Sequence, residues 1–160
     1  MIYSGTAWKF GDDIDTDLII PSQYLDLGPE EYTKHVMEPI DPEFPEKVKE
    51  GDVILAGKNF GAGSSREHAV VALKALGIAA IVAESFSRIF FRNAINQGLA
   101  VIESEEAVQR SAEGDELEID LKLGKVRNLS TGEAFEGTEF PDFILGIIAK
   151  GGAIAYYKDH

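Results

Sequence analysis

Three short apolar segments separated by helical patterns constrain the fold of this chain more than any other feature of its sequence. The segments lie at residues 52–56, 78–83 and 99–102, and each is apolar at nearly every position. Helices are expected between them, at 65–76 and 86–96, and a glycine follows each helical pattern. Strands that are apolar on both faces are typical of a parallel sheet covered by helices. We therefore expect an α/β fold with right-handed crossovers, in which ligands bind at the carboxyl ends of the strands.

The flanking segments add antiparallel β structure to this parallel unit. Short strands separated by glycine turns follow the unit and predict a meander. A single domain over residues 1–160 accommodates all of these elements. The further elements expected are a strand at 2–10, a loop at 22–28, a helix at 29–37, an exposed connection at 38–51, a helix at 103–112, strands at 115–121, 125–129 and 133–136, and helices at 141–149 and 153–158.

Charge and composition exclude several classes of function. The net charge is -13, so the surface as a whole does not suit the phosphate backbone of a nucleic acid. The chain has no cysteine, which excludes disulfides and thiolate metal sites on it. No apolar run approaches the roughly 18 residues of a membrane span, and the first residues lack the pattern of a signal peptide. We expect a cytoplasmic protein.

The most informative stretch is GKNFGAGSSREHA, residues 57–69, which links the first apolar strand to the first helix. Free N–H groups at a helix start favour anions. The stretch differs from a P-loop, which has a lysine after its last glycine, and from a dinucleotide fingerprint, which has a third glycine where Arg66 stands. Anion binding at this turn requires neither motif.

Two interpretations of the turn follow from its residue types. In the structural one, Ser64 and Glu67 form a capping box, and His68 is a packed or hydrogen-bonded histidine. Arg66 argues against this interpretation, because a cation is electrostatically unfavourable at a helix start. In the functional one, helix N–H groups and the guanidinium activate Ser64 as a base, while Ser65 and Arg66 hold a carboxylate.

An aspartate-rich loop at 11–17 precedes a short apolar run at 18–21. The spacing of Asp13, Asp15 and Asp17 resembles the start of a calcium-binding EF-hand loop. Leu18 and Tyr24 stand where that loop requires glycine and glutamate, so the calcium interpretation is weak. The alternatives are a solvated Asx-rich turn and a loop that directs one aspartate into an active site.

Three ordered segments together carry a resemblance to a known family. The segment at 61–69 resembles the signature of the swivelling domain of the aconitase superfamily, and the segments at 11–17 and 85–94 agree with it in order and spacing. The resemblance covers nearly the whole chain. At this length the chain is similar to the separate small subunits of the isopropylmalate dehydratase branch of that superfamily.

The resemblance implies a β/β/α swivelling domain that pairs with a large subunit carrying a 4Fe–4S cluster on its own cysteines. It also implies reversible dehydration and rehydration of a 2-hydroxy di- or tricarboxylate. Carried over by position, Ser64 is the base, Ser65 and Arg66 bind a substrate carboxylate, and Asp17 is a further contributor. The absence of cysteine fits a cluster held by the partner.

The family reads the variable group of its substrate with the loop after Pro21, which here contains Tyr24, Leu25, Asp26 and Leu27. The two leucines suit an apolar group, and the aspartate would repel a third carboxylate. Isopropylmalate is therefore favoured over citrate or homocitrate, the homoaconitase substrate, while citramalate and dimethylmalate stay open. The alternative from another class is a stand-alone module that binds an anion, such as phosphate, at the helix start.

Overall fold

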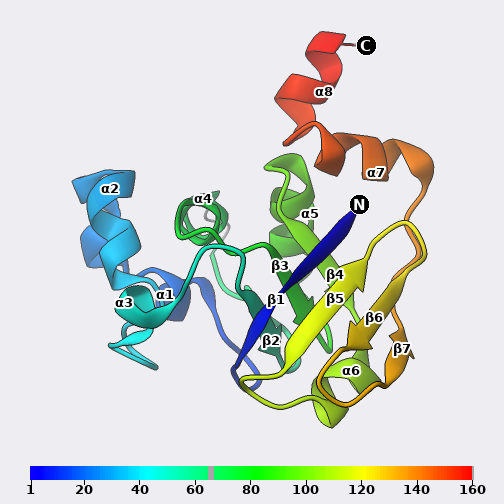
Figure 1. Cartoon of the computed structure of the whole chain (residues 1–160). Coiled ribbons are helices and arrows are strands. Elements are labelled where there is room, and N and C mark those ends of the chain that lie inside the picture. The colour runs from blue at the N-terminus through cyan, green and yellow to red at the C-terminus, as the bar shows by residue number, and fades with distance from the viewer. Residues whose placement is uncertain (65–66, 160) are drawn as a thin grey trace.

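The computed structural model describes residues 1–64 and 67–159, and their main feature is a seven-stranded sheet in the order β4-β3-β2-β1-β5-β6-β7 (Figure 1). The strands are β1 Ile2–Lys9, β2 Val53–Ala56, β3 Ala80–Ala83, β4 Ala100–Glu103, β5 Glu116–Asp120, β6 Lys125–Asn128 and β7 Ala134–Glu136. The α-helices are α1 Thr16–Ile19, α2 Pro29–Tyr32, α3 Phe44–Lys47, α4 Glu67–Ala75, α5 Arg88–Asn96, α6 Glu105–Arg110, α7 Asp142–Ala149 and α8 Ala153–Asp159. Two 3₁₀ helices are η1 Ser22–Leu27 and η2 Thr33–His35.

Half of the sheet is parallel, as the apolar segments predicted. β1, β2, β3 and β4 pair in parallel, with Val53 opposite Ala80 and Ala80 opposite Ala100. All residues of β2 and β3 are buried, which explains why these strands show no alternation of apolar and polar side chains. The helices α4 and α5 connect β2 to β3 and β3 to β4, so the α/β prediction is confirmed.

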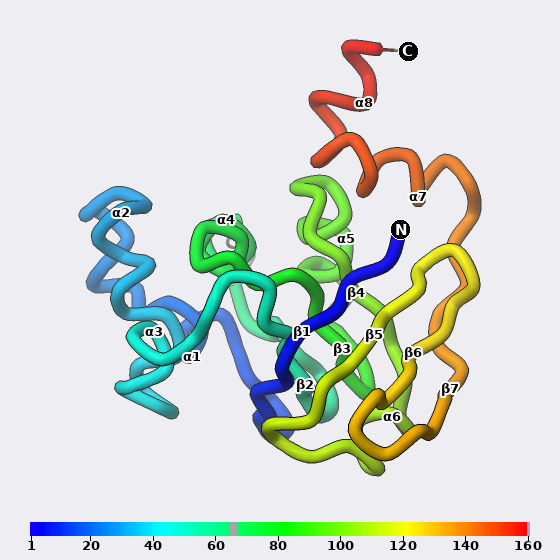
Figure 2. Tube along the Cα trace, in the orientation of Figure 1, coloured from blue at the N-terminus to red at the C-terminus, as the bar shows by residue number. Residues whose placement is uncertain are grey.

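The other half is an antiparallel meander, and β1 joins the two halves. β1 pairs in parallel with β2 on one side and antiparallel with β5 on the other, with Gly5 opposite Leu117. β5, β6 and β7 then follow as successive antiparallel neighbours. The sequence predicted this added β region but did not place the first strand between the two halves. Figure 2 shows the N-terminal strand lying beside β5.

The connection at 38–51 was predicted to be exposed, and most of its residues are, but one side chain anchors it to the core. The connection contains helix α3, whose Phe44 is fully buried. The Phe44 ring packs edge-on against Trp8 and Phe10, with centroid distances of 5.2 and 5.4 Å. Burial of one phenylalanine side chain is favourable by several kcal/mol, at about 25 cal/mol per Å² of apolar area. Phe44 therefore anchors to β1 a segment that is otherwise rich in proline and charged residues.

Other segments differ in their helical structure from what the sequence suggested. The loop expected at 22–28 is mostly the 3₁₀ helix η1, and the helix expected at 29–37 is divided into α2 and η2. The helix expected at 65–76 is described from Glu67, and residues 65 and 66 lie outside the described part of the chain.

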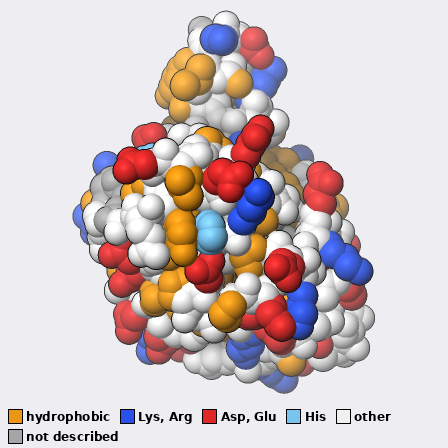
Figure 3. Space-filling model, turned by 90° about the vertical axis from the view of Figure 1, so that its left-hand side faces the viewer, with side chains coloured by type: hydrophobic (Ala, Val, Ile, Leu, Met, Phe, Trp, Pro, Cys, Tyr) orange, Lys and Arg blue, Asp and Glu red, His pale blue; other side chains and the backbone are white. Residues whose placement is uncertain are grey.

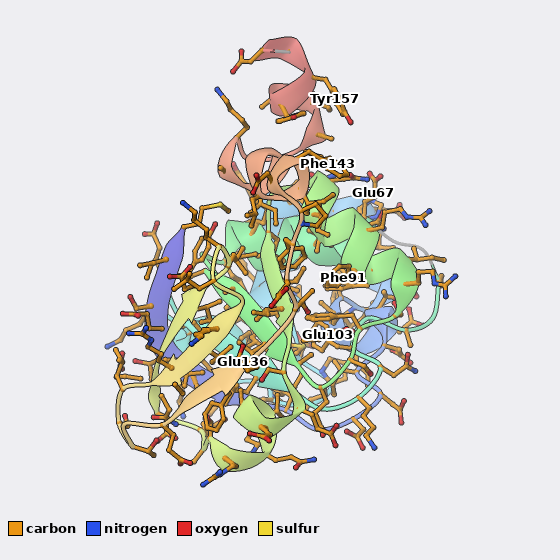
Figure 4. All side chains as sticks on the ribbon, turned by 90° about the vertical axis from the view of Figure 1, so that its right-hand side faces the viewer. Glu67, Phe91, Glu103, Glu136, Phe143 and Tyr157 are labelled. Atoms are coloured by element: carbon orange, nitrogen blue, oxygen red, sulfur yellow. The ribbon has the colours of Figure 1, made fainter. Side chains whose placement is uncertain are left out.

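Helices α7 and α8 stand at one end of the molecule. Figure 4 shows α7 above the upper end of α5, with α8 extending away from the sheet. Ile154 and Tyr157 on α8 are 78% and 65% exposed, so this helix presents apolar side chains to solvent. Within the described residues, no helix has both the length and the apolar character needed to span a membrane.

Candidate functional site

The aspartate-rich loop and the glycine-rich turn lie against one another. The Asp13 amide donates to the Lys58 carbonyl at 2.8 Å, and the Gly61 amide donates to the Ile14 carbonyl at 2.7 Å. The Thr16 amide donates to the Ala62 carbonyl at 2.9 Å. Two segments that are far apart in the sequence therefore form one structure at the carboxyl end of β2, where the parallel-sheet rule places ligands.

The side chains of the aspartate-rich loop bond to nearby backbone and amide groups. Asp12 accepts from the Lys58 amide at 2.7 Å, and Asp13 accepts from the Asn59 side chain at 3.2 Å. Asp15 caps α1 by accepting from the Leu18 amide at 2.9 Å. These contacts fit the Asx-turn alternative. Within the described residues there is no group of three or more histidine, aspartate or glutamate side chains able to hold a metal.

The glycines of the turn are sites of close packing. At Gly57, a Cβ atom would overlap with the Asp12 carboxylate, and at Gly61 it would overlap with the Phe90 ring. Gly61 and Gly63 also have positive φ angles of 82° and 98°, which side-chain-bearing residues rarely adopt. The turn thus reaches its position because it lacks side chains at these points.

The segment after β3 supports the turn from the other side. The Ser85 hydroxyl accepts from the Asn59 amide at 2.9 Å, and the Ser87 hydroxyl donates to the Gly61 carbonyl at 2.9 Å. Asn59 itself has a positive φ of 62°, which asparagine tolerates better than most residues. No role was predicted for these supporting residues from the sequence, although Ser85 and Ser87 belong to the segment 85–94 that carries part of the family resemblance.

The predicted base Ser64 is exposed at the end of this turn, three residues before Glu67, the first described residue of α4. Its carbonyl accepts from the Thr16 hydroxyl at 3.2 Å. Asp17, which follows Thr16 in the first turn of α1, is also exposed and is held next to the same loop. The structure therefore brings the segments of Ser64 and Asp17 together. Ser65 and Arg66, the predicted carboxylate ligands, lie outside the described residues.

The predicted recognition residues lie on η1, which follows α1. Tyr24 and Leu25 are partly buried against the core, whereas Asp26 and Leu27 are exposed, Leu27 to 50%. This arrangement fixes the start of the segment and leaves its tip open to a ligand or partner. Figure 3 shows the face over α1 to α4, where charged and hydrophobic side chains surround a histidine.

A stacked pair holds the start of the recognition segment. The Tyr24 ring stacks on His35 with a centroid distance of 3.7 Å and an interplanar angle of 4°. Glu38 accepts from the Tyr24 hydroxyl at 3.0 Å and also contacts His35 Nδ1. The hydrogen bond from His35 lowers the pKa of the Glu38 carboxyl, with a smaller contribution from Tyr24. His35 is partly buried in this cluster.

The recognition region also reaches the helix that follows the turn. Tyr32 is buried at the end of α2, and its ring lies edge-on to His68 on α4, with centroids 6.0 Å apart. Burial raises the pKa of the Tyr32 hydroxyl. His68 itself is exposed, so this edge-on contact does not make it the packed histidine of the structural interpretation.

The geometry defines a class of site. An exposed serine precedes a nine-residue helix at the carboxyl end of a parallel strand, and backbone hydrogen bonds fix the turn that carries it. N–H groups at the start of such a helix stabilise negative charge on a ligand or on an alkoxide. The arrangement suits proton abstraction from, or binding of, an anionic small molecule.

Comparisons with known proteins agree with this geometry. The Aconitase C-terminal domain family matches residues 13–107. The chain is 56% identical to 3-isopropylmalate dehydratase small subunit 1 of Methanopyrus kandleri over 98% of this chain and 93% of that one. It is 51% identical to the isopropylmalate/citramalate isomerase small subunit of Methanocaldococcus jannaschii, over 98% and 94% of the two chains.

A solved structure agrees with the whole fold. The crystal structure of a 3-isopropylmalate dehydratase from Methanocaldococcus jannaschii superposes with a TM-score of 0.93 at 48% identity, covering 99% of this chain and 95% of that one. The chain belongs to the aconitase C-terminal domain family. Within that family, two of the relatives that it matches over nearly their full length are named 3-isopropylmalate dehydratase small subunits.

Proposed function

We propose that this chain is the small subunit of a two-subunit hydro-lyase that interconverts 2-isopropylmalate and 3-isopropylmalate in cytoplasmic leucine biosynthesis. The observation that carries the proposal is near full-length identity of 50 to 56% to proteins named as such small subunits. The exposed serine at the helix start is consistent with it, because dehydration next to a carboxylate requires a base. We propose that residues 1–160 act as one domain.

In this proposal, Ser64 accepts the proton from the substrate carbon that lies next to a carboxylate. The electrons of that C–H bond form the double bond of the dehydrated intermediate, the C–O bond breaks with its electron pair on the departing hydroxide, and a proton from solvent converts the hydroxide to water. Ser65 and Arg66 bind the carboxylate, and Asp17 contributes from the adjoining loop. The N–H groups at the start of α4 lower the cost of negative charge on the Ser64 oxygen.

The large subunit supplies the thiolate ligands of a metal cluster, which this chain lacks. With no cysteine in the sequence, a cluster ligated by thiolates has to be held by another polypeptide. We propose a 4Fe–4S cluster on that subunit, which supplies Lewis-acid chemistry at the hydroxyl and a carboxylate. The residues of this chain bind and orient the substrate and move the proton.

Tyr24, Leu25, Asp26 and Leu27 are proposed to contact the variable group of the substrate. Leu25 and Leu27 favour an isopropyl group, and the exposed Asp26 disfavours a third carboxylate. Citramalate is a second candidate substrate, because one full-length relative is named an isopropylmalate/citramalate isomerase. A methyl group in place of isopropyl changes binding by about 1–3 kcal/mol per methylene, so the two substrates are separable by kinetics.

The test is a substitution in the complex with the large subunit. Ser64→Ala should lower kcat by about 10²–10⁴-fold, the usual contribution of a general base. Ser4→Ala, at an exposed serine on β1, is the matched control and should keep full activity. Size-exclusion chromatography of each variant with the large subunit checks assembly. Near wild-type turnover by an assembled Ser64→Ala complex would disprove the assignment of the base.

The same assay distinguishes the proposed function from its alternatives. Isopropylmalate, citramalate and homocitrate are compared at equal concentrations, and the isolated chain is assayed beside the complex. We expect turnover of isopropylmalate by the complex and none by the isolated chain. A preference for homocitrate would contradict the role given to Leu25, Asp26 and Leu27, and turnover by the isolated chain would contradict the two-subunit proposal.

A further inference from the structure

Thr16 makes two contacts with the glycine-rich turn. It is the first residue of α1 and is 3% exposed. Its amide donates to the Ala62 carbonyl at 2.9 Å, and its hydroxyl donates to the Ser64 carbonyl at 3.2 Å. One buried residue therefore holds the carbonyls on both sides of Gly63.

Gly63 is the residue of the turn whose backbone conformation depends most on hydrogen bonds from other segments. Its φ of 98° lies in the region that glycine adopts freely, and glycine has the largest conformational freedom of any residue. A Cβ atom at Gly63 would lie 3.4 Å from the Thr16 hydroxyl oxygen, so the two residues are close neighbours. Upstream, the amide and carbonyl of Gly61 are held by Ile14 and Ser87. The hydrogen bond from the Thr16 hydroxyl restrains the backbone in the same way on the other side of Gly63, at the Ser64 carbonyl.

The position of Thr16 explains why its hydroxyl reaches across to the turn. A threonine inside a helix often donates to the carbonyl four residues earlier, but Thr16 begins α1 and has no such carbonyl in that helix. A hydroxyl buried without an acceptor is unfavourable, so the Ser64 carbonyl satisfies Thr16 while Thr16 restrains Ser64. The isosteric valine would pack in the same space without this restraint.

We infer that Thr16 is a positioning residue, whose hydroxyl fixes the Ser64 peptide so that the Ser64 side chain keeps one orientation at the start of α4. The inference rests on the proposed role of Ser64 as the base. A displacement of about 1 Å at a reacting group lowers turnover by up to about 100-fold. Because a base acts in the chemical step, the loss falls mainly on kcat, while KM changes little.

Thr16→Val, Thr16→Ser and Thr16→Ala, each assembled with the large subunit, test the inference. We expect Thr16→Val to lower kcat about 10- to 100-fold with KM within about threefold of wild type. Thr16→Ser, which keeps the hydroxyl, should stay within about threefold of wild-type kcat, and Thr16→Ala should resemble valine. Ser104→Ala is the control, because it also removes a buried hydroxyl that donates to a backbone carbonyl, that of Glu136 at 2.8 Å, and should not lower kcat.

A second measurement is independent of turnover. Amide exchange, followed by NMR on the full chain without its partner, reports on the Thr16–Ala62 and Gly61–Ile14 hydrogen bonds. Both amides should exchange faster in Thr16→Val than in Thr16→Ser, since the turn has lost one of its restraints. Unchanged exchange in Thr16→Val would contradict the restraint itself.

The outcomes separate this inference from the proposed function. If Ser64→Ala is inactive while Thr16→Val has wild-type kcat, the positioning role is overturned and the base assignment stands. If Thr16→Ser and Thr16→Ala lose activity equally, the methyl group and not the hydroxyl matters, which also overturns the inference. If Ser64→Ala is active, the assignment of Ser64 as the base is wrong and the catalytic role of Thr16 falls with it, while amide exchange still tests whether Thr16 restrains the turn. Should Thr16→Val not fold, the comparison of Thr16→Ser with Thr16→Ala decides the question.

Discussion

Gly61 and Gly63 allow backbone strain and packing overlap to be measured separately within one turn. Both have positive φ, so alanine at either position costs about 1–2 kcal/mol in the left-handed region. At Gly61 the new Cβ would also overlap with the ring of Phe90, which is 2% exposed and cannot swing into solvent. Overpacking of this kind adds about 1–3 kcal/mol. We therefore expect Gly61→Ala to destabilise the chain by about 2–5 kcal/mol and Gly63→Ala by about 1–2 kcal/mol.

The assay is urea unfolding of the purified chain, followed by circular dichroism. The free energy of unfolding should fall further in Gly61→Ala than in Gly63→Ala, while the denaturant slope stays the same in both. A double variant, Gly61→Ala with Phe90→Leu, should recover part of the loss if the ring is the obstacle. Equal losses in the two single variants would refute the packing argument, because backbone strain alone would then account for both.

Two further predictions concern regions away from the turn. Phe44→Ala should cost about 3–5 kcal/mol in urea unfolding, whereas Ile40→Ala, at a 39% exposed position of the same connection, should cost much less; similar small losses would mean that α3 does not anchor the connection. Hydrogen bonds from the Ala112 amide and the Asn128 side chain lower the pKa of Asp115 from 3.8. The unfolded chain therefore binds this proton at higher pH than the folded chain, so the stabilisation is present above about pH 4 and is lost as the pH falls through the folded pKa. Wild type should lose more unfolding free energy than Asp115→Asn between about pH 5 and pH 2, and parallel losses would contradict this.

The parallel half of the fold was predictable because β2 and β3 are apolar on both faces, and few other structures bury such segments. The antiparallel meander was predictable from its turns. The position of β1 was not, because its burial pattern reflects different neighbours along its length, and pairing with both β2 and β5 depends on contacts that no local pattern records. The burial of Phe44 was not predicted, because the prolines and charged residues around it indicated an exposed segment more strongly than one aromatic residue indicated a buried one.

The candidate site, too, was predictable only in part. Ser64 and Asp17 were selected from motifs, and the structure brings their segments together through Thr16. Their chemical roles remain predictions. Thr16, Asn59 and Ser87 were not selected, because each acts through a hydrogen bond or backbone conformation that depends on a distant segment. Sequence patterns identify residues that could carry chemistry more readily than the residues that hold them in place.

The central place of β1 has a consequence for how the chain folds. β1 is separated from its antiparallel partner β5 by most of the chain, since Thr6 pairs with Glu116. Pairing between such distant segments requires closing a large loop, and this slows folding relative to proteins dominated by local contacts. The parallel half needs residues only to the end of β4, so it has the opportunity to assemble first. We expect β1 to have an unpaired edge until β5 pairs with it, which makes this edge the point where a nascent or truncated chain is most prone to pair with another chain.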